Sequence, residues 1–218
     1  MIRAALLDVD GTLLASNDAQ ARSWSDALAE AGRDVDFTTI RRSIGLGGDR
    51  LLRSVAGLAE DEEPGKTISR RRREILLQRY ARDLTPTPGA RDLVEWLRQR
   101  GARVVVATGA SAEEVDTLLR AARVDDLIDV TVTADDAART KPAPDIIVAA
   151  LERAAVPASD AVMIGDTPYD IVAADAASVP AIALRCGGWS AADLAGAAVF
   201  ADPQDLVERY RESPLREW

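Results

Sequence analysis

The segment "IRAALLDVDGTLL" (residues 2–14) joins an apolar run to two carboxylates, Asp8 and Asp10, that stand one residue apart. The apolar part is typical of a buried strand. A carboxylate at the end of such a strand is costly unless it is paired, protonated or bound to a metal. One interpretation is a simple Asp-Gly turn, which is common turn chemistry. The other is that the strand presents both carboxylates to a functional site.

Apolar segments of this kind recur along the chain and alternate with segments of helical spacing. We expect strands at residues 2–8, 102–108, 127–133, 160–166, 180–184 and 197–200. We expect helices within residues 88–101, 111–122 and 144–156, and the second of these begins with a capping-box spacing at Ser111 and Glu114. Almost wholly apolar strands that alternate with helices predict an α/β fold, in which a Rossmann-like parallel sheet carries helices on both faces.

Residues 16–85 interrupt this alternation, because they contain several helix-like stretches and no convincing strand. The segment begins after the first strand and ends at the Pro-rich "TPTPGA" (85–90), which suits a hinge or linker. We therefore expect an α/β core made of residues 1–15 and 86–218, with a helical domain of residues 16–85 inserted into it. The arginine run "SRRRRE" (69–74) in this insert is interpreted as a solvated helix face.

The composition excludes several classes of protein. Hydrophobic residues make up 47% of the 218 residues and charged residues 29%, which is ordinary for a soluble globular protein. No apolar run approaches the roughly 20 residues of a membrane helix, and the N-terminus lacks the pattern of a secretory signal. A net charge of -9 argues against a nucleic-acid partner. We therefore expect a cytoplasmic protein that binds neither membrane nor nucleic acid; the oligomeric state is not predicted.

The chain contains no histidine and one cysteine, Cys186. Ser-His-Asp and Cys-His nucleophiles, imidazole metal ligands and cysteine-based zinc sites are therefore excluded. Lysine is scarce as well, since Lys66 and Lys141 are the only two. Any catalysis has to rely on carboxylates, hydroxyls, lysine or a hard metal ion.

Polar residues stand where four of the expected strands end, which is the edge at which open parallel sheets bind ligands. They are Asp8 and Asp10, then Thr108 and Gly109, then Lys141 in the loop region after the third strand, and finally Asp166 and Asp170. Crowded carboxylates repel one another unless a cation neutralises them, and an all-oxygen ligand set suits Mg²⁺. A lysine, a hydroxyl and backbone N–H groups make a phosphate cradle. An ionised carboxylate can act as a nucleophile without help from histidine.

These motifs resemble those of the haloacid-dehalogenase-type hydrolases, an α/β superfamily dominated by Mg²⁺-dependent phosphatases. "DVDGTLL" (8–14) matches the D-x-D-G-T signature, and Thr108, Lys141 and "GDTPYD" (165–170) match the other three motifs in order. The resemblance covers essentially the whole chain, because the insert at 16–85 lies where the phosphoglycolate phosphatase and β-phosphoglucomutase-like subgroup carries its mobile cap domain.

The resemblance implies a role for each motif residue. Asp8 attacks phosphorus and forms an aspartyl-phosphate, which water then hydrolyses. Asp10 is the general acid for the leaving group and then the base for that water. Thr108 and the N–H of Gly109 hold phosphoryl oxygens, while Lys141 offsets negative charge on the nucleophile and the phosphate.

The resemblance also implies how Mg²⁺ is held and what the substrate is. The ligands are Asp8, the backbone carbonyl of Asp10 and Asp166, with Asp170 as a further ligand or as a partner of one. The favoured function is a phosphatase acting on a small phosphorylated metabolite such as phosphoglycolate or a sugar phosphate. The presence of Asp10 disfavours the dehalogenating and phosphonate-cleaving branches.

Two alternative functions remain open besides the phosphatase. A β-phosphoglucomutase-like mutase characteristically has a cap histidine, and Gln20 stands about where it would be. A non-enzymatic regulator that binds a phosphorylated ligand would not need a nucleophile placed beside an acid. Cap contacts to the substrate are expected in "RRSIGLGGDR" (41–50), at Gly47 and at Arg50 or Arg42, unless this segment is only a helix–helix turn.

Overall fold

The computed structural model describes residues 2–217 and contains one six-stranded parallel sheet in the order β3-β2-β1-β4-β5-β6. The strands are β1 (Ala4–Leu7), β2 (Arg103–Ala107), β3 (Val130–Val132), β4 (Ala161–Gly165), β5 (Ala181–Leu184) and β6 (Ala198–Phe200). All six lie inside the expected segments. The third is shorter than expected, because the N–H of Leu127 closes a turn onto the carbonyl of Val124 before the strand begins.

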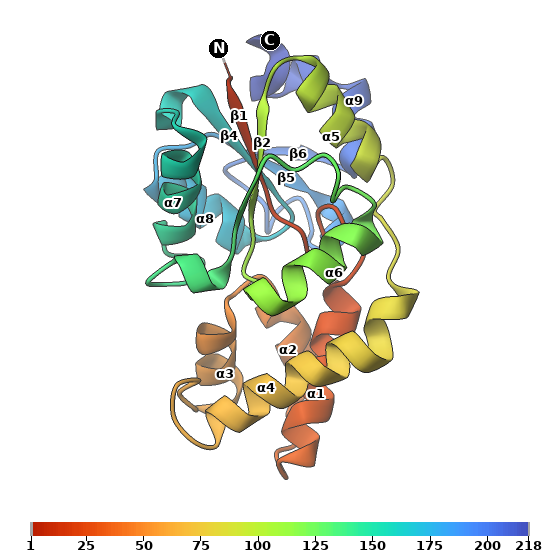
Figure 1. The fold of residues 1–218 in the computed structure, drawn as a ribbon, viewed down its shortest axis with the longest axis vertical. Helices are drawn as coiled ribbons and strands as arrows, with labels where there is room; N and C mark the ends of the chain where they lie inside the picture. Colours follow the sequence, from red (N-terminus) through yellow and green to blue (C-terminus); the bar gives the residue numbers. More distant parts are fainter. Residues whose placement is uncertain (1, 218) are drawn as a thin grey trace.

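Helices cover both faces of this sheet, as expected (Figure 1). They are α5 (Ala90–Gln99), α6 (Ala112–Ala122), α7 (Asp145–Ala154), α8 (Pro168–Ala176) and α9 (Pro203–Glu208). Alternate residues of a strand point to opposite faces, so Ala5 and Leu7 of β1 pack with α5, α6 and α9, whereas Ala4 and Leu6 pack with α7 and α8. The α/β fold class is therefore confirmed.

The order of the strands reverses beside β1, which decides where a ligand can bind. The chain moves from β1 outward through β2 to β3, then returns to place β4 on the other side of β1. Leu7 pairs with Val106 on one side and with Ile164 on the other, so these three strands end close together. Open parallel sheets bind ligands at this reversal, outside the carboxyl ends of the strands.

A helical region stands at one end of the molecule, beyond the carboxyl ends of the strands (Figure 1). It consists of α1 (Asn17–Glu30), α2 (Phe37–Ser43), α3 (Gly48–Ala56) and α4 (Gly65–Ile75), which is continued by a turn of wider helix at Leu76–Tyr80. These helices enclose a core of their own, whose members include Trp24, Leu28, Ile40, Leu52 and Ile68. This region, called the cap below, thus buries an apolar face that does not depend on the sheet.

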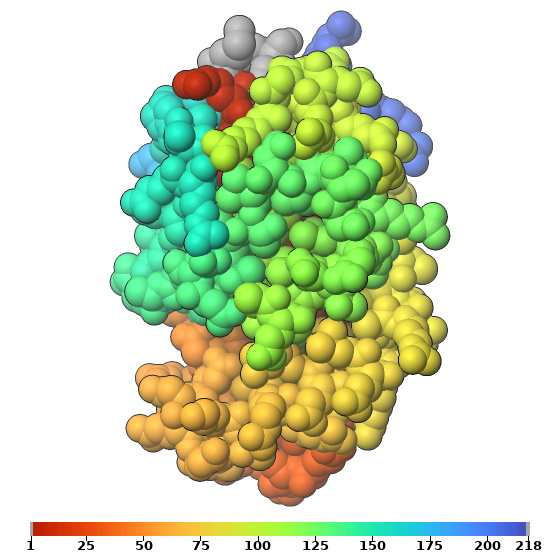
Figure 2. Space-filling view, viewed as in Figure 1, coloured from red at the N-terminus to blue at the C-terminus, as the bar shows by residue number. Residues whose placement is uncertain are grey.

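Two chain crossings connect the cap to the core, and they lie side by side. The N–H of Ala15 donates to the carbonyl of Thr85 at 2.9 Å, and the N–H of Thr87 donates to the carbonyl of Leu13 at 3.1 Å. In the space-filling view the cap, in orange and yellow, lies directly against green segments of the core (Figure 2). No helix within residues 2–217 is both long enough and apolar enough to span a membrane.

Candidate active site

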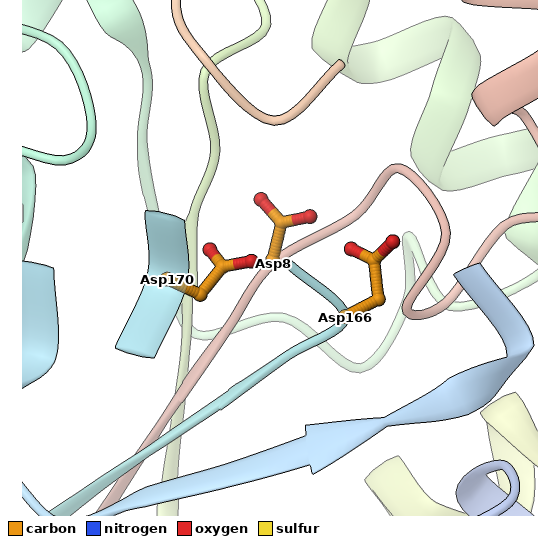
Figure 3. A group of neighbouring side chains, drawn as sticks. All are labelled: Asp8, Asp166 and Asp170. Carbon is orange, nitrogen blue, oxygen red and sulfur yellow. The ribbon is translucent and has the colours of Figure 1, made fainter. Parts of the chain in front are cut away.

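Three carboxylates meet at the reversal point of the sheet. Asp8 follows β1, Asp166 follows β4, and Asp170 lies in the first turn of α8. Each offers an oxygen, and these oxygens lie within 4.8 Å of one another (Figure 3). All three residues are buried. The Asp-Gly turn does form after Asp10, with Gly11 at a φ of 79°, but it presents carboxylates to this site instead of simply reversing the chain.

Crowding and burial make the carboxyls of Asp8 and Asp166 hard to ionise. Burial raises the pKa of Asp8 to about 7, even though Lys141 opposes the shift. Burial also raises the pKa of Asp166 well above its usual range, and the charges of Asp8 and Asp170 add to this. A hard divalent cation bound by oxygen ligands would relieve the repulsion, and the donor set fits Mg²⁺.

Lys141 supplies a buried cation among these acids. Its Nζ donates to Oδ1 of Asp8 at 2.7 Å and to Oδ1 of Asp170 at 2.6 Å. The other oxygen of Asp170 accepts from the N–H and the hydroxyl of Thr167, which closes the capping box of α8. Asp170 therefore anchors both the lysine and the helix. The N-cap of α8 is Thr167, so Asp166 is not used to cap this helix.

Asp10 is directed away from the three-acid cluster and toward the cap. Its Oδ1 accepts hydrogen bonds from Oγ of Ser16 and from Nε2 of Gln20, the latter at 2.9 Å. Burial raises the pKa of Asp10, and the two hydrogen bonds oppose the rise. A carboxyl that holds its proton more readily than usual suits a general acid. The predicted metal ligand at this residue is its backbone carbonyl, which leaves the side chain available for that role.

A chain of hydrogen bonds continues from Gln20 across the boundary between cap and core. Oε1 of Gln20 accepts from Nη2 of Arg72, and Nη1 of Arg72 donates to Oε1 of Glu114 on α6. We call these three residues the Arg72 bridge. The other oxygen of Glu114 accepts from the hydroxyl of Ser111 at 2.8 Å, in the expected capping box. The bridge thus ties the partner of Asp10 to the core.

The interpretation of the arginine run as a solvated face is wrong for Arg72. Its side chain is 13% exposed, its ion-pair partner Glu114 is 2% exposed, and its guanidinium lies 5.3 Å from the ring centre of Trp24. Only the direction in which α4 packs on α1 and α6 decides which arginine of the run turns inward. Arg71 and Arg73 form more exposed pairs, with Glu30 and Glu113.

The residues expected to cradle a phosphate, Thr108 and Gly109, directly follow β2. Thr108 is buried, and its hydroxyl accepts from the N–H of Ala110 at 3.1 Å. A Cβ added to Gly109 would meet only the Cα of Gly47, at 3.9 Å, so the backbone here is open to a ligand. Gly109 lines the cavity described next.

A cavity of about 600 Å³ opens between the cap and the strand ends. Its lining includes Asp8, Asp10 and Gly109 from the core and Gln20, Arg53, Lys66 and Arg72 from the cap. Several residues of the expected segment 41–50 line it, namely Ile44, Gly45, Leu46, Gly48 and Asp49. The residues named for substrate contacts, Gly47, Arg50 and Arg42, are not among the described residues that line it. Arg53, almost one helical turn beyond Arg50, does line it.

Gly47 and Arg42 contact the core instead. A Cβ on Gly47 would lie 2.2 Å from side-chain atoms of Thr140, so only glycine allows the loop at 44–48 to approach the core this closely. Arg42 stacks over Trp189, 4.6 Å from the ring centre, and pairs with Asp193 at 3.5 Å. These residues therefore hold the cap against the core at the rim of the cavity.

One buried residue at the site was not anticipated from the sequence. Nδ2 of Asn17, the first residue of α1, donates to Oδ2 of Asp166 at 2.8 Å and to the carbonyl of Gly187 at 3.1 Å. Its position at the start of a helix gave no signal of this contact, because an asparagine there is common helix-end chemistry.

The chain is similar to known proteins in both sequence and fold. The family described as "haloacid dehalogenase-like hydrolase" matches residues 2–178. The protein SUPPRESSOR OF QUENCHING 1 of Arabidopsis thaliana is 34% identical over 188 residues, which are 84% of this chain but only 18% of that much longer protein. A phosphoglycolate phosphatase of Rhodospirillum rubrum is 32% identical over 93% of this chain and 88% of its own length. The crystal structure of CbbY from Rhodobacter sphaeroides with xylulose-(1,5)bisphosphate is 29% identical, with a TM-score of 0.79 over 94% of this chain and 96% of that one.

Proposed function

Because the chain belongs to the haloacid dehalogenase-like hydrolases, we propose that it is a Mg²⁺-dependent phosphatase that cleaves a small organic phosphomonoester through an aspartyl-phosphate on Asp8. One observation carries the proposal. Asp8 lies 2.7 Å from the buried cation Lys141, and the separate acid Asp10 stands two residues away and faces the cap. A binding protein would not need a nucleophile and an acid in this arrangement.

In the proposed first half-reaction, an oxygen of Asp8 attacks phosphorus and the bond from phosphorus to the leaving oxygen breaks. Asp10 donates its proton to that oxygen, so the product leaves as an alcohol. Lys141 offsets negative charge on the nucleophile and the phosphoryl group, while the hydroxyl of Thr108 and the N–H of Gly109 hold phosphoryl oxygens. Mg²⁺, held by Asp8, the Asp10 carbonyl and Asp166 with Asp170 beside them, would supply charge neutralisation.

In the second half-reaction, Asp10 acts as the base. It takes a proton from a water molecule, whose oxygen attacks the phosphorus of the aspartyl-phosphate. The acyl-phosphate bond breaks, inorganic phosphate leaves, and the carboxylate of Asp8 is restored. Asp10 then carries the proton needed for the next cycle, so the two half-reactions balance. Splitting the displacement into two steps lowers the barrier of each.

The proposed substrate is a small phosphorylated metabolite such as phosphoglycolate or a sugar phosphate, and the proposed location is the cytoplasm. The phosphoglycolate phosphatase relative supports the first substrate, and the CbbY structure with a sugar bisphosphate supports the second. Hydrolysis is favoured over phosphoryl transfer between positions of one sugar, because Gln20 contacts Asp10 where the mutase subgroup has a titratable histidine.

Hydrolysis of p-nitrophenyl phosphate, with added Mg²⁺ and then with excess EDTA, tests the proposal. We expect activity that EDTA abolishes and that Asp8→Asn reduces to a few per cent or less. Asp116→Asn, at a carboxylate whose side chain is 78% exposed, is the matched control and keeps full activity. Phosphorus NMR on phosphoglycolate and β-glucose-1-phosphate then separates hydrolysis from isomerisation. Substantial activity in Asp8→Asn would exclude the covalent mechanism.

A further inference from the structure

Asn17 links the cap to a carboxylate of the proposed metal site. It is 4% exposed and belongs to α1, whereas its partners Asp166 and Gly187 follow β4 and β5 of the core. Its single amide nitrogen donates to both of them, at 2.8 and 3.1 Å. The contact therefore joins three segments that are far apart in the sequence.

The amide meets Oδ2 of Asp166 in a tightly packed place, while the hydroxyl of Thr12 donates to the other oxygen, Oδ1, at 3.4 Å. A Cβ on Gly187 would lie 1.7 Å from Oδ2 of Asp166. A Cβ on Gly11 would lie 2.2 Å from the same oxygen and 2.2 Å from Nδ2 of Asn17. Two neighbouring positions thus lack a side chain where the carboxylate meets the amide. This packing holds the Asp166 side chain in one orientation.

The other end of the amide has no partner within the described residues. Oδ1 of Asn17 is buried and accepts no hydrogen bond there. A buried acceptor without a donor costs about 1–3 kcal/mol, so such atoms are rare unless a ligand or water completes them. Mg²⁺ in proteins usually keeps several of its waters, and these are strong hydrogen-bond donors. An unsatisfied acceptor beside the crowded carboxylates fits a hydrated ion.

We propose that Asn17 is a positioning residue for the magnesium site, which orients Asp166 through its amide nitrogen and accepts a hydrogen bond from a metal-bound water through its amide oxygen. The inference rests on the proposed function, because it takes Asp166 as a ligand of Mg²⁺. Since Asn17 belongs to the cap, metal binding and cap position are coupled. Such coupling is reciprocal: the seated cap strengthens metal binding, and the metal stabilises the seated cap.

Isothermal titration of Mg²⁺ into the whole 218-residue chain tests the first part, with no need for turnover. We expect Asn17→Ala to bind the ion 10- to 100-fold more weakly than wild type, as is usual when a residue that orients a metal ligand is lost. Arg41→Ala is the matched control. Nη2 of Arg41 donates to the same carbonyl of Gly187 at 2.7 Å, so this variant disturbs the Gly187 loop without removing the amide contact to Asp166. We expect its affinity to stay close to wild type.

The outcomes separate this inference from the proposed function. If the wild-type protein binds no Mg²⁺, the proposed function fails and the inference fails with it. If wild type binds and Asn17→Ala binds equally well, only the inference fails. It fails too if Arg41→Ala weakens binding as much as Asn17→Ala does, because the effect then passes through the Gly187 loop. If Asn17→Ala does not fold, the titration is repeated with Asn17→Ser. The melting temperature of Asn17→Ser in EDTA then shows whether that variant is folded without the metal ion.

Hydrogen–deuterium exchange tests the coupling to the cap. In wild type, saturating Mg²⁺ is expected to slow exchange of the backbone amides of α1 several-fold. In Asn17→Ala, at a Mg²⁺ concentration that saturates the variant, the slowing is expected to disappear. Equal slowing in both proteins would overturn the coupling.

Discussion

The ion pair between Arg72 and Glu114 should be worth about 2 kcal/mol to the stability of the protein. The perturbation is a double-mutant cycle of Arg72→Met and Glu114→Gln, which removes each charge alone and then both together. Arg72 is 13% exposed and Glu114 is 2% exposed, so solvent screens the pair only weakly. The pair is also hydrogen-bonded, which makes its geometry specific.

The magnitude follows from what each variant leaves behind. Two charges about 4 Å apart attract by about 4 kcal/mol in surroundings of intermediate polarity, and desolvation removes part of this. A charge-assisted hydrogen bond retains about 1.5–3 kcal/mol after that cost. Arg72→Met leaves the buried Glu114 with only its bonds to Ser111, which should cost about 3–5 kcal/mol. Glu114→Gln removes the stranded charge when it is added to Arg72→Met, so it should cost about 2 kcal/mol less in that background than in wild type.

Urea unfolding followed by tryptophan fluorescence measures the cycle, because Trp24 lies in the cap core beside the Arg72 guanidinium. The double variant is expected to be about 2 kcal/mol more stable than the sum of the single variants predicts. Arg79→Met is the matched control, since the pair of Arg79 with Asp26 lies on the surface and should contribute under about 1 kcal/mol. A coupling energy below about 0.5 kcal/mol between Arg72 and Glu114 would refute the reasoning and show that the bridge is open in solution.

Two further predictions concern the metal site and the cap loop. Without Mg²⁺, the melting temperature should fall more in wild type than in Asp8→Asn as pH rises from about 4 to 7. The pKa of Asp8 is about 7 in the folded state, compared with the usual 3.8. Between these two pH values the folded state holds more protons than the unfolded state, so its stability is lost as pH rises. An equal fall in melting temperature in wild type and Asp8→Asn would contradict this prediction. Gly47→Ala should lower kcat/KM about ten- to hundredfold with little change in melting temperature, because its Cβ would lie 2.2 Å from Thr140 and displace the loop. Unaltered steady-state kinetics in Gly47→Ala would show that the loop has room.

The core of the site could be located from the sequence because its residues are tied to strand ends. Parallel strands place their carboxyl ends at one edge of the sheet, so a polar residue after each apolar run is brought to a common place by the fold itself. The structure does bring Asp8, Lys141, Asp166 and Asp170 together. The absence of histidine in the chain left carboxylates and lysine as the groups able to act there.

The cap contacts could not be located in this way, because they depend on how one helix is rotated against another. Arg70 to Arg73 look equivalent in the sequence, yet only Arg72 meets Glu114, which lies 42 residues further along the chain. The contact of Asn17 with Asp166 spans 149 residues and has no local signature. Gly47 was expected at the substrate, and its role in close packing against Thr140 became visible only with the loop in place.

The neighbouring chain crossings have a consequence for how such proteins diversify. Ala15 and Thr85 are already joined by a backbone hydrogen bond, so the segment between them leaves and re-enters the core at one point. The entropic cost of closing a loop grows only slowly with its length, so an insert here can be lengthened, shortened or replaced with little effect on how the sheet folds. Mutation and recombination can therefore alter the helices that face the cavity while the strand ends stay unchanged. Asp10 accepts hydrogen bonds from Ser16 and Gln20, and Asp166 accepts one from Asn17, so every new insert must supply these donors again at its start.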